Sequence, residues 1–154
     1  MQDATNMHSS GAPDPEGSGA LRLGPFRVST ACADIEAFRC ETGWSVDDCS
    51  AEGRAKSIQV PHTFPMRWLT VPELWRVLEI KLKEAGGIAV HESQSFTYET
   101  PLDADQDYLM TADIDHQMNP ERLIVRTSVV TARDEPCLRM ETILRIISAA
   151  GSAP

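Results

Sequence analysis

The sequence predicts an α+β fold in which one long amphipathic helix packs against an antiparallel sheet. Between residues 72 and 85 the apolar residues recur at helical spacing. From residue 88 to residue 147, four segments instead alternate apolar and polar residues, as strands with one covered face do. The chain has 154 residues, of which 42% are apolar and 6% aromatic, and this composition is typical of a globular protein.

Both ends of the chain are predicted to lie outside the fold. Residues 1–20 contain eight Gly, Pro or Ser, no Lys or Arg, and no periodic apolar pattern, so no burial would offset the entropy lost on ordering them. Residues 149–154 form a second short tail. One domain over residues 21–148 remains, and its roughly 130 residues suffice to bury about two-thirds of the unfolded surface.

The first half of this domain is predicted to contain a strand, a short helix and a long loop. Residues 21–29 resemble a strand, and residues 31–43 a helix, because Ile35 and Phe38 share one helical face and Gly43 stands at its end. Residues 45–58, between Trp44 and Gln59, are polar and without period, which indicates a loop. In the segment 60–70, two prolines bracket His62 and Phe64 and favour a rigid extended or turn geometry.

The long helix has the clearest boundaries in the sequence. Thr70 and Glu73 have the spacing of a capping box, Pro72 suits a first helical turn, and Gly86 with Gly87 ends the pattern. Five apolar residues form a stripe that should face the core. They are Leu74, Val77, Leu78, Leu82 and Ala85.

Four strands are predicted after this helix, at residues 88–100, 107–117, 122–133 and 137–147. The last is the most regular, with Arg139, Glu141 and Arg145 on one face. The other face carries Leu138, Met140, Thr142, Leu144 and Ile146. In the first, Glu92 and Gln94 interrupt an apolar series that we place on one face. Either that face opens onto a polar cavity or the strand has an exposed end. The interrupted series is Ile88, Val90, Phe96 and Tyr98.

Charge and cysteine spacing exclude several classes of function. The net charge of −9, without runs of Lys or Arg, argues against nucleic acid or an anionic membrane as the main partner. No apolar stretch approaches the roughly 18 residues of a membrane span, and no signal peptide is recognisable, so we expect a cytoplasmic protein. The four cysteines form no Cys-x-x-Cys pair and have no His at ligand spacing, which predicts buried or idle thiols and no metal site.

Several short motifs occur in an order that resembles a known family. They are Asp34-Ile-Glu-Ala-Phe38, Thr42-Gly43, Val60-Pro61 with Thr63-Phe64-Pro65, His91 with Gln94 and Phe96, and Pro101-Leu102. Their order and spacing resemble the N-terminal-half type of MaoC-like acyl-thioester dehydratases, which have the hot-dog fold, over about residues 21 to 148. The chain departs from the family at Glu92 and at Ala104-Asp105, where Gly and Gly-Asp are common.

The resemblance implies a reaction but not a complete set of catalytic residues. Enzymes of this family add or remove water across 2-enoyl or 3-hydroxyacyl thioesters of coenzyme A or acyl carrier protein. This chemistry needs a general acid, a general base and donors to the thioester oxygen. Catalytic members take an Asp and a His from a segment G-D-x-N-P-x-H. Aligned from Gly43, the Asp position is Trp44 and the His position is Cys49, so no catalytic residue is assigned.

Four residues are predicted to contact substrate, and three of them have a structural alternative. Trp44 could instead be a core or rim aromatic, and His62 and His91 could be structural histidines. They are Trp44, His62, Phe64 and His91. If the chain were catalytic alone, His62, His91, or the adjacent Asp47 or Asp48 would have to replace the missing pair.

Three functions follow from the resemblance. In the first, the chain is a dyad-lacking subunit that forms the acyl tunnel and pairs with a second hot-dog chain carrying the Asp/His pair. In the second, it is a non-enzymatic hot-dog protein that binds acyl thioesters or a partner protein. In the third, it is a self-sufficient homodimeric hydratase with a rearranged site. None implies a metal or redox cofactor, because acid/base groups carry the reaction; the acyl group, its carrier, the reaction direction and the pathway stay open.

Overall fold

A computed structural model describes residues 20–43 and 59–148 of the chain. The elements, in order, are β1 (Leu21–Ser29), α1 (Cys32–Glu41), the 3-10 helix η3 (Phe64–Thr70), α2 (Pro72–Ala85), β2 (Gly87–Tyr98), β3 (Asp107–Met118), β4 (Glu121–Val130) and β5 (Pro136–Ser148). The strands form one five-stranded sheet in the order β1-β3-β4-β5-β2, and every neighbouring pair is antiparallel.

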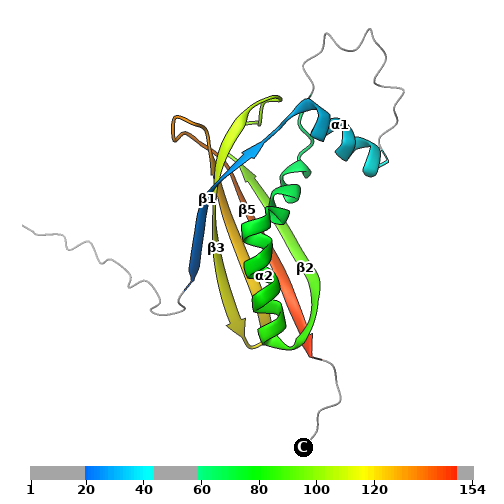
Figure 1. The fold of residues 1–154 in the computed structure, drawn as a ribbon, viewed down its shortest axis with the longest axis vertical. Helices are drawn as coiled ribbons and strands as arrows, with labels where there is room; N and C mark the ends of the chain where they lie inside the picture. The colour runs from blue at the N-terminus through cyan, green and yellow to red at the C-terminus, as the bar shows by residue number, and fades with distance from the viewer. Residues whose placement is uncertain (1–19, 44–58, 149–154) are drawn as a thin grey trace, which may run out of the picture.

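The sheet and α2 form two layers, as the sequence predicts. Figure 1 shows α2 lying along one face of the sheet, between the two edge strands. We call this the inner face and the opposite one the outer face. The predicted α+β fold, with a long helix against an antiparallel sheet, is confirmed.

The core lies between α2 and the inner face. On the helix, Leu74 and Leu78 are buried, and the other three residues of the predicted stripe are half-buried. They meet apolar residues at alternate positions of β3, β4 and β5, because successive strand residues point to opposite faces. The strand residues of this core include Met110, Ala112, Ile114, Val125, Val129, Leu138 and Met140.

The start of α2 differs from the prediction. Val71, not Thr70, is the N-cap residue, and no side-chain cap hydrogen bond is formed. Thr70 instead belongs to η3, where its hydroxyl donates to the carbonyl of Arg67 at 2.6 Å. The prediction of a capping box is therefore wrong, because the Thr70 hydroxyl is already hydrogen-bonded within the preceding 3-10 helix. The helix ends as predicted at Gly86, whose φ of 67° is the left-handed conformation that glycine adopts readily.

The segment 60–70 is partly a turn, as expected, but most of it is helical. His62 and Thr63 form the turn, and η3 follows from Phe64. Pro65 stands in the first turn of η3, where the amide hydrogen that it lacks has no helical acceptor. Proline spacing alone does not distinguish such a 3-10 helix from an extended segment.

The two edge strands of the sheet differ. In β1 the pairing register shifts between Leu23 and Phe26, at Gly24 and Pro25. Gly24 has a φ of 102°, and a Cβ there would lie 2.8 Å from the carbonyl oxygen of Met110, so this bulge requires glycine. Pro25 offers no backbone donor. The edge at β1 is therefore poorly suited to pairing with a further strand.

A second bulge, in β2, corrects the predicted face of that strand. The register with β5 shifts between His91 and Ser93, so Glu92 is the extra residue. Ile88 pairs with Ile147 on the outer face, whereas Phe96, beyond the bulge, pairs with the core residue Met140 on the inner face. The apolar series 88, 90, 96 and 98 therefore does not lie on one face, because the bulge exchanges the two faces between residues 91 and 93.

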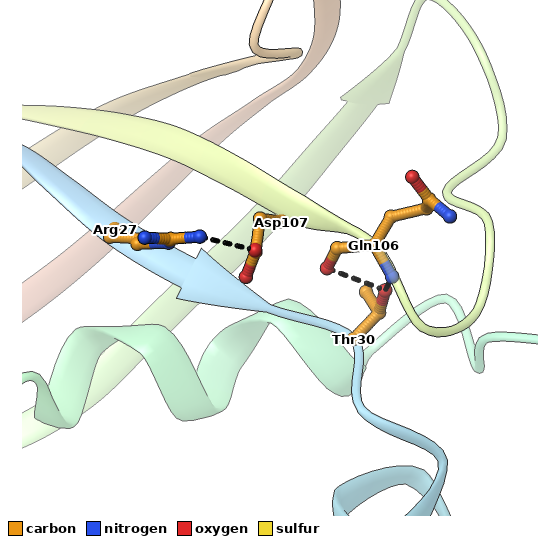
Figure 2. Close-up of polar contacts among 4 residues, drawn as sticks. All are labelled: Arg27, Thr30, Gln106 and Asp107. Atoms are coloured by element: carbon orange, nitrogen blue, oxygen red, sulfur yellow. Dashed lines mark hydrogen bonds and ion pairs between the residues drawn. The ribbon is translucent and has the colours of Figure 1, made fainter.

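Thr30 fastens the loop before β3 to the end of β1. Its fully buried hydroxyl donates to the carbonyls of Asp103, at 2.6 Å, and Gln106, at 3.2 Å, and accepts from the amide of Gln106 at 3.0 Å. Figure 2 shows Thr30 and Gln106 joined in this way, beside the ion pair of Arg27 and Asp107. This contact fixes the Pro-Leu turn against β1.

Replacement of Thr30 by valine is expected to lower the free energy of unfolding by about 1–3 kcal/mol, because buried backbone groups lose their partner. Chemical denaturation measures the change. The matched control is Thr127→Val, since Thr127 is equally buried but its hydroxyl has no hydrogen-bond partner among the described residues. That substitution should be neutral or stabilising. Equal losses in both variants would contradict the role given to Thr30.

Candidate functional site

Of the four predicted substrate-contacting residues, three lie in the described part of the chain. Trp44 lies outside it, as do Asp47, Asp48 and Cys49. Phe64 is buried and packs edge-to-face against Phe38, at 5.6 Å between ring centroids, and Trp68, at 6.1 Å. Its main structural role is in the core, although one part of its ring borders a surface hollow.

His62 precedes η3 in the sequence and packs against Tyr98, the last residue of β2. Its ring meets Tyr98 edge-to-face, with 5.4 Å between ring centroids, and its carbonyl accepts a hydrogen bond of 2.6 Å from the Tyr98 hydroxyl. Phe96 stacks on the other side of Tyr98, at 6.4 Å. His62 itself is exposed. The tyrosine thus holds the backbone of residue 62 while leaving the imidazole accessible.

Burial of Tyr98 raises its pKa from 10.0 to about 12. Its pKa is higher in the folded than in the unfolded chain, so the associated stability is present below pH 10 and is lost as the pH rises toward 12. We expect absorbance titration of the folded protein to show one tyrosine ionising near pH 12. Tyr98→Phe should remove this transition and leave that of Tyr108, the other tyrosine, whose pKa is also raised by burial. A midpoint of Tyr98 near pH 10 would contradict the burial.

His91 lies on the inner face of β2, opposite Leu144 of β5, and its side chain is exposed at the sheet edge. Gln94, also on the inner face, is half-buried, and its Oε1 accepts a hydrogen bond of 2.7 Å from the hydroxyl of the buried Thr142. A polar pair therefore stands within the apolar inner face, one bulge away from His91. The sequence offered two explanations for the polar residues of this strand, a polar cavity or an exposed strand end. Gln94 fits neither of them fully, because it is half-buried and hydrogen-bonded within an apolar face.

Glu92, the bulge residue, points away from this region. Its carboxylate pairs with Arg122 of β4, and the Arg122 Nε–Glu92 Oε2 distance is 2.7 Å. The hydrogen bond from Arg122 holds the pKa of Glu92 below its ordinary value, with a smaller contribution from Arg145. Glu92 is therefore ionised and paired with Arg122, which makes it a poor general acid.

The structure does not bring His62 and His91 together. His62 touches Tyr98, seven positions along β2 from His91. At about 3.3 Å per strand residue, the two histidines are separated by roughly 20 Å. Within one chain they cannot act on the same reacting atoms.

The edge at β2 has a bulge, like the edge at β1, but lacks the other features that protect an edge strand. Its 12 residues contain no Lys, Arg or Pro, and its one carboxylate is held by Arg122. On the adjoining outer face, Ile88, Val90 and Ile147 are 68%, 44% and 50% exposed. This edge, unlike that at β1, is suited to extend the sheet by a strand from another chain.

Asp105 is a polar residue whose role the sequence does not indicate. Its carboxylate accepts hydrogen bonds from the amide of Cys32, at 2.8 Å, and from the thiol of Cys32, at 2.9 Å. Asp105, in a loop 73 residues further along the chain, therefore supplies a hydrogen-bond acceptor for a backbone amide in the first turn of α1. The hydrogen bond to Asp105 also raises the pKa of Cys32, so its thiol is less reactive.

Residues 20–43 and 59–148 contain no group of three or more His, Cys, Asp or Glu arranged to hold a metal ion. None of their helices is long and apolar enough to cross a membrane.

Comparison with known proteins gives structural matches only. No family model and no curated protein matches the sequence. The truncated HadBC complex of Mycobacterium tuberculosis, a 3R-hydroxyacyl-ACP dehydratase, aligns with a TM-score of 0.61 and 15% identity over 81% of this chain and 95% of that one. A hot-dog-like protein from Thermanaerovibrio acidaminovorans has a TM-score of 0.54, with 15% identity over 88% and 84%.

A third solved structure, the R-hydratase PhaJ1 from Pseudomonas aeruginosa, has a TM-score of 0.51, with 12% identity over 90% of each chain. At these identities the similarity is one of fold. It agrees with the strand order, the antiparallel pairing and the position of α2. The chain therefore has the hot-dog fold, the fold shared by these hydratase and dehydratase structures.

Proposed function

We propose that this chain is the dyad-lacking subunit of a two-chain acyl-thioester dehydratase or hydratase. Its part is to line the acyl tunnel and to assemble with a hot-dog chain that carries the Asp/His pair. Two facts from the sequence support this, namely Trp44 at the Asp position of the family motif and Cys49 at the His position. The indole of Trp44 cannot take up a proton at neutral pH, so it cannot replace the carboxylate of the pair.

The observation that carries the proposal is the difference between the two edges of the sheet. Both strands have a bulge, but β1 also contains a proline and two arginines, whereas β2 contains no proline, Lys or Arg and exposes Ile88 and Val90. A partner strand on β2 would satisfy the free backbone groups and cover this apolar surface. It would also cover His91, which projects from the inner face at the same edge.

The partner in this proposal is a second hot-dog chain. HadBC, which has a similar fold, is described as a complex. A second copy of this chain would complete the sheet equally well but would bring no Asp/His pair. An enzyme that uses the Asp/His pair therefore requires a different partner, while a homodimer fits the alternatives of a thioester-binding protein or a hydratase with a rearranged site.

Co-purification of the native protein from its own cells tests the proposal directly. We expect a stoichiometric second chain that mass spectrometry identifies and whose sequence contains an intact G-D-x-N-P-x-H segment. Recovery of a homodimer alone, with no such chain, would contradict the two-chain enzyme. A monomer at micromolar concentration with no partner in the extract would contradict any association through β2.

Lysine substitution at the sheet edge locates the interface. Val90→Lys places an unpaired charge in the proposed interface and should weaken association at least about tenfold, as measured by sedimentation, because a buried unpaired charge costs several kcal/mol. Leu21→Lys is the matched control, since Leu21 is 39% exposed on β1, at the opposite edge. Equal effects of the two variants would show that β2 is not the interface.

A further inference from the structure

The outer face of the sheet carries two like charges directly opposite each other. In the register of β4 and β5, Arg122 is the partner of Arg145. Both point to the outer face, because they lie an odd number of positions from Val125 and Met140, the core residues of their strands on the inner face. Residues paired in this way have Cβ atoms about 4.5–5.5 Å apart, and like charges at that spacing are destabilising.

A single carboxylate serves these two guanidinium groups. Glu92 pairs with Arg122, and the two side chains are only 29% and 23% exposed. Arg145 acts on the same carboxylate only through space. Among residues 20–43 and 59–148, the exposed side chain of Arg145 forms no hydrogen bond or ion pair. The described part of the chain therefore holds one uncompensated positive charge at this point of the outer face.

Arg145 stands beside the apolar surface at the β2 edge. Its partner in β2 is Val90, and the next pair on the outer face is Ile88 with Ile147. Val90, Ile88 and Ile147 are 44%, 68% and 50% exposed. A guanidinium without an acceptor therefore borders the surface that the proposed partner strand would join.

An ion pair on this face can span two strand spacings. Glu92 belongs to β2 and Arg122 to β4, so their contact crosses β5, which lies between them. Arg145 is on β5, one strand in from the edge, so a strand added to β2 would lie at the same two spacings from it, about 9–10 Å. A carboxylate on such a strand, beside Val90, would be within reach of Arg145.

A second copy of this chain brings no free carboxylate to that position. The one acidic residue of β2, Glu92, is held by Arg122, and Glu99, directly after the strand, is held by Arg139. Pairing of β2 with its own copy would therefore leave two uncompensated arginines near the joined edges. The charge favours a strand from a different chain.

We propose that Arg145 determines the choice of partner, by binding a carboxylate on the edge strand of a different hot-dog chain when that strand pairs with β2. The inference rests on the proposed function and deepens it, because it states the chemistry of the partner. On the outer face, the partner strand carries Asp or Glu beside Val90 and an apolar residue beside Ile88, two positions along. A local conflict in the isolated chain is thus resolved in the complex, and such conflicts are expected at functional sites.

Charge reversal at Arg145 separates stability from association. In the isolated chain, Arg145→Glu places a carboxylate opposite Arg122 instead of a like charge, so the urea midpoint should be unchanged or higher. With the co-purified partner, the same variant should bind at least about tenfold more weakly in calorimetric titration, because two carboxylates then face each other. A purely structural role of Arg145 would change stability and association in the same direction.

Arg22→Glu is the matched control, because it makes the same change of charge on the outer face at the opposite edge. Arg22 lies on β1, is 71% exposed and stands 3.9 Å from Asp113. A charge roughly 20 Å or more from the added strand is largely screened at physiological salt, so the affinity should stay within about twofold of wild type. Equal losses in the two variants would reduce the effect to net charge and refute the role of Arg145.

The sequence of the co-purified partner supplies a second arm. Replacing its acidic residue beside Val90 with lysine should weaken binding to the wild-type chain and restore binding to Arg145→Glu. Three outcomes would each overturn the inference: no acidic residue in the partner's edge strand, equal affinity of wild type and Arg145→Glu, or a loss of stability in the isolated variant. A complex with an Asp/His chain under any of these outcomes would leave the proposed function standing, whereas failure to recover such a chain would contradict both.

Discussion

Purified alone, the chain is expected to hydrate crotonyl and longer enoyl thioesters about 10²-fold to 10⁴-fold more slowly than a hot-dog hydratase that carries the Asp/His pair. This is the contribution that one positioned general acid or base makes. The loss follows from Trp44 and Cys49 at the positions of the pair. The absorbance of the enoyl thioester at neutral pH gives the rate, and adding the co-purified partner should restore it.

The control for this experiment is a set of single substitutions in the isolated chain. If the chain turned over substrate robustly after every contaminating hydratase was removed, the two-chain proposal would fail. His62→Ala, His91→Ala and Asp48→Asn would then show which group abolishes the rate. His62 and His91 lie roughly 20 Å apart in one chain, at about 3.3 Å per strand residue, so loss of the rate in both variants would require a site shared between two copies.

The sequence predicts the elements of this fold well because each depends on local periodicity. All five strands and both α-helices occur where the pattern of apolar residues places them. The period of two identifies β5, and the stripe that includes Leu74 and Leu78 identifies α2. Both signals survive because one face of each element is covered and the other is not.

Features that depend on single residues or on distant partners were not predictable. The bulge at Glu92 has no turn residue to mark it, yet it exchanges the faces of β2 and brings Gln94 to the inner face. The hydroxyl of Thr70 could either accept from the amide of Glu73, as in a capping box, or donate to the carbonyl of Arg67, and the 3-10 helix favours the second. Asp105 reaches α1 from a loop 73 residues away, so no local pattern could indicate its role.

The candidate site was predictable to a smaller extent than the fold. The absence of the Asp/His pair is inferred from the family motif alone, because Trp44 and Cys49, which stand at its two positions, lie outside the described residues. His91 was predicted to contact substrate, and the structure shows it exposed at the sheet edge, opposite Leu144. The surface hollow beside Phe64 is bordered by residues of β1, α1 and η3 that lie far apart in the sequence and share no motif. Such sites arise from tertiary packing, which sequence spacing does not encode.

Leu78→Ala is expected to lower the free energy of unfolding by about 2–5 kcal/mol, because it removes buried methyl groups and leaves a cavity that the sheet cannot close. Leu78 is 3% exposed and packs in the core between α2 and the inner face. Urea denaturation followed by circular dichroism measures the change. If the slope of the unfolding free energy against urea concentration is unchanged, the substitution has altered stability and not the compactness of the denatured state.

Ile80→Ala is the matched control, because it truncates an aliphatic side chain of the same helix at a position that is 50% exposed. Alanine has the higher helix propensity, by up to about 0.7 kcal/mol, which offsets part of the apolar contact that is lost. We therefore expect a change below about 1 kcal/mol, typical of surface substitutions. If Leu78→Ala cost less than half a kcal/mol, or no more than Ile80→Ala, α2 would not lie with Leu78 against the sheet. The hot-dog arrangement would then be wrong for this chain, because the long helix is the element that covers its inner face.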